Sequence, residues 1–282
     1  MFMPENMSEA SRVTSLIRFI KPSTYWNRAR RAWFDWSYDF QKVRNEENDR
    51  FRAAGYDQHA ALAELDQHLL DMELPVFEKC GDMASVHWLL FACLARRHRI
   101  ARVLEIGTFD GQTTSLLARL FPLAEVVTVE LPSTDPILAN TYEYVRGGLN
   151  KLTAFEERLR KNIHAPNIKL VRANSFFLPA VVEGDFDLVW IDGGHLYPEI
   201  AWDICNAYHR VRSGGFLMCD DIIIHPKGKR DAYVSPDAHD VLQYLVARTS
   251  DRLELYLKRT SAEWSADPRA RKYVALLTKT SG

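Results

Sequence analysis

Two hydrophobic periodicities alternate along the chain from residue 101 onward. Short apolar runs bounded by glycine or polar residues are followed by longer segments in which apolar residues recur every three to four positions. The first pattern is typical of buried strands and the second of amphipathic helices. Their alternation predicts an α/β fold around a mostly parallel sheet. Strands are expected at 101–106, 125–130, 168–172, 186–191 and 215–220, and helices at 111–121, 153–164, 197–212 and from 235 to about 248.

Local signals refine these elements. Thr153 and Glu156 have the spacing of a capping box, which predicts that a helix begins there. Ser235 and Pro236 suit an N-cap and a first-turn proline. In the helix expected at 197–212, the apolar residues face inward, and Glu199, Asp203 and Arg210 lie on the opposite side. Two strand-like runs, Leu253 to Lys258 and Tyr273 to Thr278, predict a terminal antiparallel hairpin.

The first 80 residues differ in composition from the rest and predict an N-terminal helical extension, with the main domain over 81–282. Residues 12–36 are basic and rich in tryptophan. Such a segment either makes weak contact with a membrane surface or forms helices that pack on the main domain or on a second subunit of a homo-oligomer. Pro22 interrupts the periodicity and favours packing. Further helices are expected from Leu62 to Met72 and over 84–97.

Composition bounds the class of protein. With 282 residues, 47% hydrophobic and 26% charged, the chain is long enough to bury a sizeable core. Its formal net charge of −1 gives no reason to expect a nucleic-acid partner. The four cysteines form no Cys-x-x-Cys pair, and the longest apolar run, 88–95, is too short to span a bilayer. The expected location is therefore the cytoplasm.

The segment from Val103 to Gly111 is the most informative motif. An apolar run stops at Gly107, and Gly111 opens the helix expected at 111–121. A buried strand, a glycine turn and a helix N-terminus form an arrangement that lets the backbone approach a nucleotide-like ligand. The spacing Glu-x-Gly-x-x-x-Gly lacks the Gly-x-Gly of dinucleotide binders, which disfavours a dehydrogenase.

Other polar residues stand at strand ends. Glu130 ends the second strand about twenty residues past the glycine turn, where an acidic side chain can accept both hydroxyls of a ribose. Ser175 follows the third strand and is either a ligand contact, a helix N-cap or both. Thr113 either donates to a ligand carboxylate or serves only its own helix.

Three carboxylates are expected to converge at two neighbouring strand ends. Asp192 follows the strand at 186–191, and Asp220 and Asp221 follow the next one. Such carboxylates repel one another unless they are protonated or bound to a cation, and a hard divalent ion suits an all-oxygen cluster. The alternative is that Asp192 contacts a ligand directly while the aspartate pair caps a loop.

These motifs resemble those of a broad enzyme family and of a narrower group within it. The segment 103–111 resembles the first motif of class I S-adenosylmethionine-dependent methyltransferases, and the spacing from Asp192 to Asp220 and Asp221 resembles that of metal-dependent O-methyltransferases. The latter include the catechol type and the magnesium-dependent sugar methyltransferases of macrolide and aminocoumarin biosynthesis. The resemblance implies a doubly wound, mostly parallel seven-stranded sheet of Rossmann-like type, with S-adenosyl-L-methionine and Mg²⁺ (or Mn²⁺) as cofactors.

The resemblance also assigns roles, as expectations. His195 stands where the catechol type has a lysine base, and Asp221 stands where that type has an asparagine, so a catechol acceptor is disfavoured. His195 is the candidate base, together with Asp192, and His225 is a weaker pocket candidate. The insertion 131–152, with Tyr142 and Tyr144, is a candidate lid over the acceptor. The cofactor is expected at Glu105, Gly107, Thr108, Phe109, Gly111, Thr113, Glu130, Asn174, Ser175 and Asp192, and the metal at Asp192, Asp220 and Asp221.

The function expected from the sequence is therefore S-adenosylmethionine-dependent, metal-dependent O-methylation of a small molecule, a sugar or a glycan precursor. Two alternatives stay open because a fold does not determine one chemistry. One is a relative with different chemistry, such as the hydroxylase-labelled members in β-lactam biosynthesis. The other is a non-catalytic protein that binds S-adenosylmethionine.

Overall fold

A computed structural model describes residues 39–77, 85–146, 148–224, 235–259 and 271–280, together with scattered positions between 25 and 36. Most of the basic segment 12–36 and all of the loop that carries His225 lie outside the described residues. The predictions made for these two segments are therefore not addressed by the structure.

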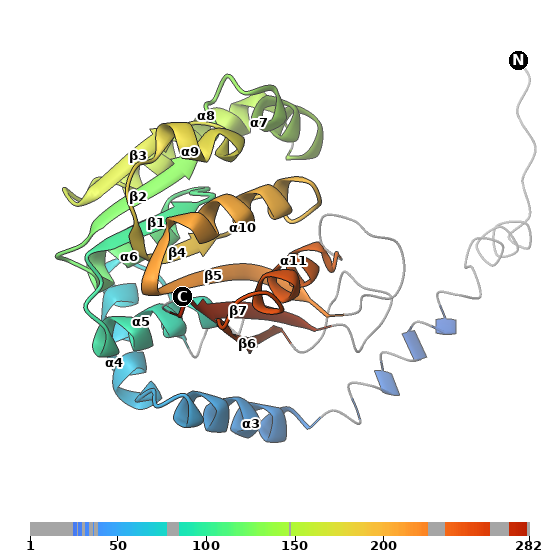
Figure 1. The fold of residues 1–282 in the computed structure, drawn as a ribbon. Helices are drawn as coiled ribbons and strands as arrows, with labels where there is room; N and C mark the ends of the chain where they lie inside the picture. The colour runs from blue at the N-terminus through green and yellow to red at the C-terminus, as the bar shows by residue number, and fades with distance from the viewer. Residues whose placement is uncertain are drawn as a thin grey trace, which may run out of the picture.

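A seven-stranded sheet forms the centre of the molecule, in the strand order β3-β2-β1-β4-β5-β7-β6 (Figure 1). The first five strands are parallel, and β7 runs antiparallel to both β5 and β6. This arrangement confirms the expected sheet and its terminal hairpin. The strands are β1 (Arg102–Ile106), β2 (Glu125–Glu130), β3 (Ile168–Arg172), β4 (Phe186–Ile191), β5 (Val211–Ile223), β6 (Arg252–Arg259) and β7 (Lys272–Thr278).

Helices cover both faces of the sheet (Figure 1). On one face lie α4, α5 and α6, and on the other lie α10 and α11. The helices are α3 (Phe40–Ala53), α4 (Gln58–Asp71), α5 (Val86–Arg97), α6 (Gln112–Leu120), α7 (Pro136–Asn140), α8 (Leu149–Asn162), α9 (Leu178–Val181), α10 (Glu199–Arg210) and α11 (Asp237–Val246), with the π-helix η2 (Thr141–Val145) and the 3₁₀-helix η3 (Ser175–Phe177).

Two hydrophobic cores result from the alternation of side chains along each strand. Val103 of β1 and Val126 of β2 pack with α4, α5 and α6, whereas their neighbours Leu104 and Val127 pack with the helices of the other face. Because a strand directs successive side chains to opposite faces, a strand that is apolar throughout must be covered on both sides. The continuous apolar runs in the sequence therefore required the two helical layers.

Two of the expected helix starts are wrong. The helix α8 begins at Leu149, directly after Gly148 in a positive-φ conformation, so Thr153 and Glu156 lie inside the helix and form no capping box. The helix α11 begins at Asp237, and the Ser235 hydroxyl accepts a hydrogen bond from its backbone N–H at 3.2 Å. Local capping signals thus located one helix start to within two residues and misplaced the other by four.

The helix α3 packs against the edge strand β6. The ring of Phe51 lies 4.8 Å from that of Tyr256, in an edge-to-face arrangement. The carboxylate of Glu47 accepts a hydrogen bond from the backbone N–H of Leu257 at 3.0 Å. This helix therefore covers a strand edge that would otherwise offer unpaired backbone groups to another chain. Residues 39–77 share one hydrophobic core with the sheet.

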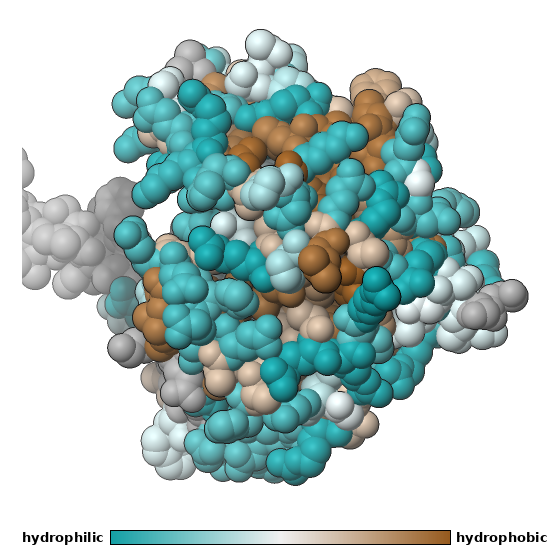
Figure 2. Space-filling model, turned by 90° about the vertical axis from the view of Figure 1, so that its left-hand side faces the viewer, coloured by the Kyte–Doolittle hydropathy of each residue, from teal (hydrophilic) through white to brown (hydrophobic). Residues whose placement is uncertain are grey.

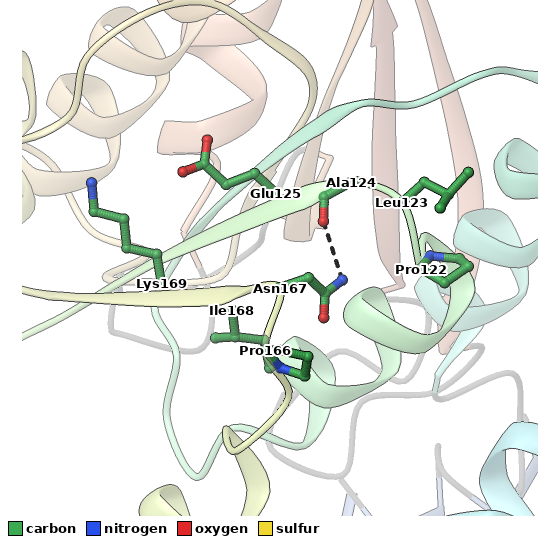
Figure 3. A pocket seen from close by; sticks show the side chains of 8 residues that line it. All are labelled: Pro122, Leu123, Ala124, Glu125, Pro166, Asn167, Ile168 and Lys169. Atoms are coloured by element: carbon green, nitrogen blue, oxygen red, sulfur yellow. Dashed lines mark hydrogen bonds between the residues drawn. The ribbon is translucent and has the colours of Figure 1, made fainter.

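The amino ends of β2 and β3 form an edge without acidic clusters. A cavity of about 380 Å³ lies there, and the Asn167 amide donates a hydrogen bond to the backbone carbonyl of Ala124 (Figure 3). The same amide also donates to the carbonyls of Ala118 and Phe121. These bonds close the end of α6, which is a structural role. The surface on this side is mostly hydrophilic with scattered hydrophobic areas (Figure 2). No described helix combines the length and the hydrophobicity that a membrane span requires.

Candidate functional site

A large cavity lies at the opposite edge, where the parallel strands end. Its volume is about 640 Å³. Ligands of doubly wound sheets bind at this carboxyl edge, beside the strand where the order reverses. Seven of the predicted site residues line it: Gly107, Phe109, Glu130, Asn174, Ser175, Asp192 and His195.

Gly107 forms the turn that opens the cavity. Its φ is +94°, and a Cβ atom at this position would collide with the backbone carbonyl of Asp192. The turn is held by backbone hydrogen bonds from Gly107 to Val129 at 3.0 Å and from Asp192 to Ile106 at 2.8 Å. Only glycine meets both requirements, so the sequence motif has the structural role expected of it.

Glu130 occupies one end of the cavity in a fixed orientation. One carboxylate oxygen accepts the backbone N–H of Phe109 at 2.7 Å, and the other accepts that of Leu131 at 3.0 Å. Burial raises the pKa of Glu130, and these two backbone bonds act against that rise. Each oxygen keeps a further lone pair for a ligand, so the carboxylate can accept two hydroxyl groups, as a ribose requires.

Glu105 and Thr108 are not among the residues that line this cavity, and their assignment as cofactor contacts stays a prediction. The Glu105 carboxylate is fully buried and accepts hydrogen bonds from the hydroxyls of Thr114 and, at 2.6 Å, of Thr128. The Thr108 hydroxyl is bonded to that of Thr128 at 2.6 Å. This network ties α6 to β1 and β2. Burial raises the pKa of Glu105 to about 7.

Gly111 and Thr113 are likewise not among the residues that line this cavity, and their contact with the cofactor stays a prediction. Gly111 has a φ of +81° and precedes α6 in close contact with Ile163 of the α8 end. The Thr113 hydroxyl accepts a hydrogen bond from the indole of Trp88 at 3.3 Å. Both residues position α6, so the second glycine of the motif has a packing role here.

Ser175 and Asp203 form a polar pair on the wall of the cavity. Ser175 is hydrogen bonded to Asp203, whose pKa burial raises to about 6. The N-cap of η3 is Asn174, whose side chain accepts the backbone N–H of Phe176 at 2.9 Å, so Ser175 is not the cap. Asp203 was expected on the solvent side of α10, yet it is buried. The cavity explains this difference, because α10 turns a polar residue toward it.

A smaller cavity of about 260 Å³ shares this wall. Phe176 and Trp202 line it with their rings stacked 4.4 Å apart, and the Trp202 indole donates to the Phe176 carbonyl at 2.8 Å. The sequence analysis did not identify Trp202. A signal was present, since Trp202 is a large aromatic residue on the polar side of an otherwise amphipathic helix.

The insertion 131–152 lies at the Glu130 end of the cavity. Leu138, Tyr142 and Arg146 line the cavity together with Glu130, and the Arg146 guanidinium lies 4.7 Å from the centre of the Phe109 ring. Tyr144, in contrast, is largely exposed. The insertion was expected to cover the acceptor, but the structure places it beside the residue predicted to hold the ribose.

His195 lies at the other end, beside the carboxylates. Its Nε2 atom is 3.7 Å from Asp192 and 4.0 Å from Asp221. Its Nδ1 atom is buried and has no hydrogen-bond partner among the described residues. Burial lowers the pKa of His195, although the charges of Asp221 and Asp220 act against this. The imidazole is therefore neutral near pH 7 and able to accept a proton.

A bulge brings Asp220 and Asp221 to the same place. Between Cys219 and Ile222, β5 has one residue more than its partner β7, and Asp221 has a φ of +53°. Consecutive residues of a regular strand point to opposite faces, but a bulge redirects one of them. Both aspartates thereby approach the same cation, Lys258 of β6, which sits at a register shift of its own.

Two lysines neutralise this pair of carboxylates. Lys258 is bonded to Asp220 and, at 2.9 Å, to Asp221, and Lys272 of β7 is bonded to the other oxygen of Asp221. Burial acts to raise the pKa of Asp221, but the nearby lysines hold it well below its ordinary value. Neither lysine was expected at this site, because both lie far from the aspartates along the chain.

The predicted metal centre does not fit these side chains. Both oxygens of Asp221 and one of Asp220 already accept lysine ammonium groups. Burial and the negative charge of Asp220 raise the pKa of Asp192 well above its ordinary value, which weakens it as a carboxylate ligand. Within the described ranges, no three His, Cys, Asp or Glu residues are placed to hold an ion. The prediction of Mg²⁺ or Mn²⁺ at Asp192, Asp220 and Asp221 is therefore not supported by this geometry.

Comparison with known proteins places this site in context. Residues 104–222 match the methyltransferase domain family. A structure titled cofactor-bound Rv0187 from MTB is 25% identical, with a TM-score of 0.52, and the similarity covers 79% of this chain and 89% of that one. The O-methyltransferase TomG from Streptomyces achromogenes, solved with SAM, is 21% identical with a TM-score of 0.50, covering 78% of this chain and 90% of that one, and shares the fold.

Among curated sequences, an uncharacterised protein of Acanthamoeba polyphaga mimivirus is 27% identical over 128 residues. The match covers 42% of this chain and 49% of that protein, so it spans about half the length of the relative. Residues 104–222, which match the methyltransferase domain family, include all the residues that line the large cavity.

Proposed function

We propose that this chain is an S-adenosylmethionine-dependent methyltransferase, which transfers the methyl group to a hydroxyl of a small-molecule, sugar or glycan-precursor acceptor. The observation that carries the proposal is one cavity with two different ends. One end offers the anchored carboxylate of Glu130, and the other offers the neutral imidazole of His195.

The cavity suits the cofactor on physical grounds. Its volume of about 640 Å³ is within the range of pockets that enclose molecules of cofactor size. Gly107 leaves the backbone accessible, Glu130 accepts the ribose hydroxyls, and Asn174 and Ser175 follow β3 on the side where an adenine lies. When bound there, S-adenosylmethionine supplies an electrophilic methyl group on a sulfonium.

The residues at the other end suit the acceptor. An oxygen of the acceptor forms the new bond to the methyl carbon, the carbon–sulfur bond breaks with its electrons staying on sulfur, and the hydroxyl proton must leave. His195 lies at the cavity wall with an unpartnered Nδ1 atom and is the group that takes this proton. Since the metal centre does not fit the side chains, the protein's own residues position the hydroxyl.

Calorimetry with S-adenosylhomocysteine tests the cofactor end. Glu130→Ala should weaken binding by about 1–3 kcal/mol, the cost of leaving ribose hydroxyls unpaired in a buried site. Glu125→Ala is the matched control, because Glu125 is the same residue type at the opposite end of the same strand, paired with Arg102. Equal affinity of Glu130→Ala and the parent would show that the cofactor is bound elsewhere.

The acceptor is tested by transfer of a radiolabelled methyl group to a panel of sugars and phenols. Label in an ether product supports O-methylation. Tight binding of S-adenosylhomocysteine with no transfer to any hydroxyl would favour the non-catalytic alternative, in which the same fold only binds the cofactor.

A further inference from the structure

The carboxylate cluster beside His195 contains its own cations. Lys258 comes from β6 and Lys272 from β7, the two antiparallel strands at the end of the sheet. A register shift at Lys258 and the bulge at Asp220 and Asp221 flank β7 on its two sides. The hairpin therefore delivers two ammonium groups to the place where the last parallel strand ends.

The charges of the cluster balance without an added ion. Asp220 and Asp221 are two negative charges, and Lys258 and Lys272 are two positive charges. A divalent cation would add two positive charges where the carboxylates of Asp220 and Asp221 are already balanced by two ammonium groups.

Burial makes the two ammonium groups difficult to displace. Lys258 and Lys272 are only 8% and 5% exposed. A cation that took the Asp221 oxygens would displace two buried ammonium groups from that carboxylate, at a desolvation cost. The incoming ion would also have to lose its own hydration shell. Both costs oppose metal binding here.

We infer that Lys258 and Lys272 stand in the place of a divalent metal ion, so that this chain binds no Mg²⁺ or Mn²⁺ at Asp192, Asp220 and Asp221. The lysines are positioning residues, which hold the aspartates and through them His195. This inference rests on the proposed function for the role of the site, but its statement about metal binding is independent of methyl transfer.

Titration of the full-length protein with Mn²⁺, followed by electron paramagnetic resonance, tests the inference. At millimolar Mn²⁺, the parent and Asp221→Asn should give the same signal, because neither binds Mn²⁺ at this cluster. The double variant Lys258→Met/Lys272→Met should bind one Mn²⁺ per chain, because its freed carboxylates form the oxygen cluster a hard cation prefers. Mn²⁺ should also raise the melting temperature of this variant. Lys279→Met is the control, since Lys279 follows β7 but donates to the carbonyls of Tyr208 and Val211 instead.

Two results would overturn the inference. One is a parent that binds one Mn²⁺ per chain and loses it in Asp221→Asn. The other is a folded double variant that stays unable to bind Mn²⁺, since the lysines would then not occupy the place of the ion. If the double variant does not fold, the measurement on the parent and Asp221→Asn decides alone. Calorimetry with S-adenosylhomocysteine is run in parallel, so that failure of the proposed function is seen separately from failure of this inference.

Discussion

Acidic side chains in the cavity and beside it are compensated in different ways. At one end of the cavity, the carboxylate of Glu130 is held by backbone N–H groups of Phe109 and Leu131. At the other end, beside His195, Asp220 and Asp221 are held by the side chains of two lysines. Backbone dipoles orient a carboxylate and leave its negative charge available to a ligand, whereas ammonium groups cancel it. The first end is suited to binding hydroxyls and the second to positioning a neutral base.

Replacing a lysine of the cluster should have the largest effect of these changes on the stability of the protein. Lys258→Met leaves two buried carboxylates without their shared cation, and the free energy of unfolding should fall by about 3–5 kcal/mol. Urea denaturation followed by circular dichroism measures it. Lys279→Met, outside the cluster, should change stability far less. A Lys258→Met variant as stable as the parent would mean that the cluster is not buried as described.

Glu105 should make the stability of the β1–α6 region depend on pH. Its pKa in the folded protein is about 7 against an ordinary value of 4.5, so the folded state keeps the proton longer than the unfolded state does. Its contribution is therefore constant below about pH 4.5 and decreases as the pH rises to 7, by about 3 kcal/mol in total. Glu105→Gln should remove this decrease, as measured by unfolding at a series of pH values. The control Glu125→Gln should retain it.

Replacing His195, the proposed base, tests the end of the cavity where the acceptor is expected. His195→Ala should lower turnover by roughly a hundredfold, the usual scale of general-base catalysis, and leave affinity for S-adenosylhomocysteine unchanged. Because burial lowers the pKa of His195 from 6.5, the rate of the parent should rise with pH in a range below 6.5 and stay level above it. A variant with parental turnover would reduce His195 to a wall of the pocket.

The smallest effect on stability is expected from a change in the insertion 131–152. Arg146 lies over the rings of Phe109 and Tyr142, at 4.7 and 5.5 Å. Arg146→Met should lower the free energy of unfolding by about 0.5–1 kcal/mol, the usual size of an exposed cation–π contact. Thermal denaturation with and without S-adenosylhomocysteine measures it. A loss that appears only with the ligand would mean that Arg146 contacts the ligand directly.

Local sequence predicted the parts of this site that depend on neighbouring residues. The strands at 125–130, 168–172 and 186–191 are observed with the expected bounds. Their ends place Glu130, Asp192 and His195 at one cavity, as the parallel alternation required. The role of Gly107 also followed from the sequence, because the need for a positive φ after a buried strand is local.

Contacts between distant segments were decided only by the tertiary structure. Glu105 and Thr113 belong to the motif, and their side chains are hydrogen bonded to residues of other elements, Thr128 and Trp88. The metal prediction rested on three aspartates within thirty residues, and the cations beside them come from positions 258 and 272. Periodicity identifies which residues end a strand, but strand pairing and two register shifts decide which charges meet there. Burial then decides whether those charges are balanced by the protein itself or by an ion.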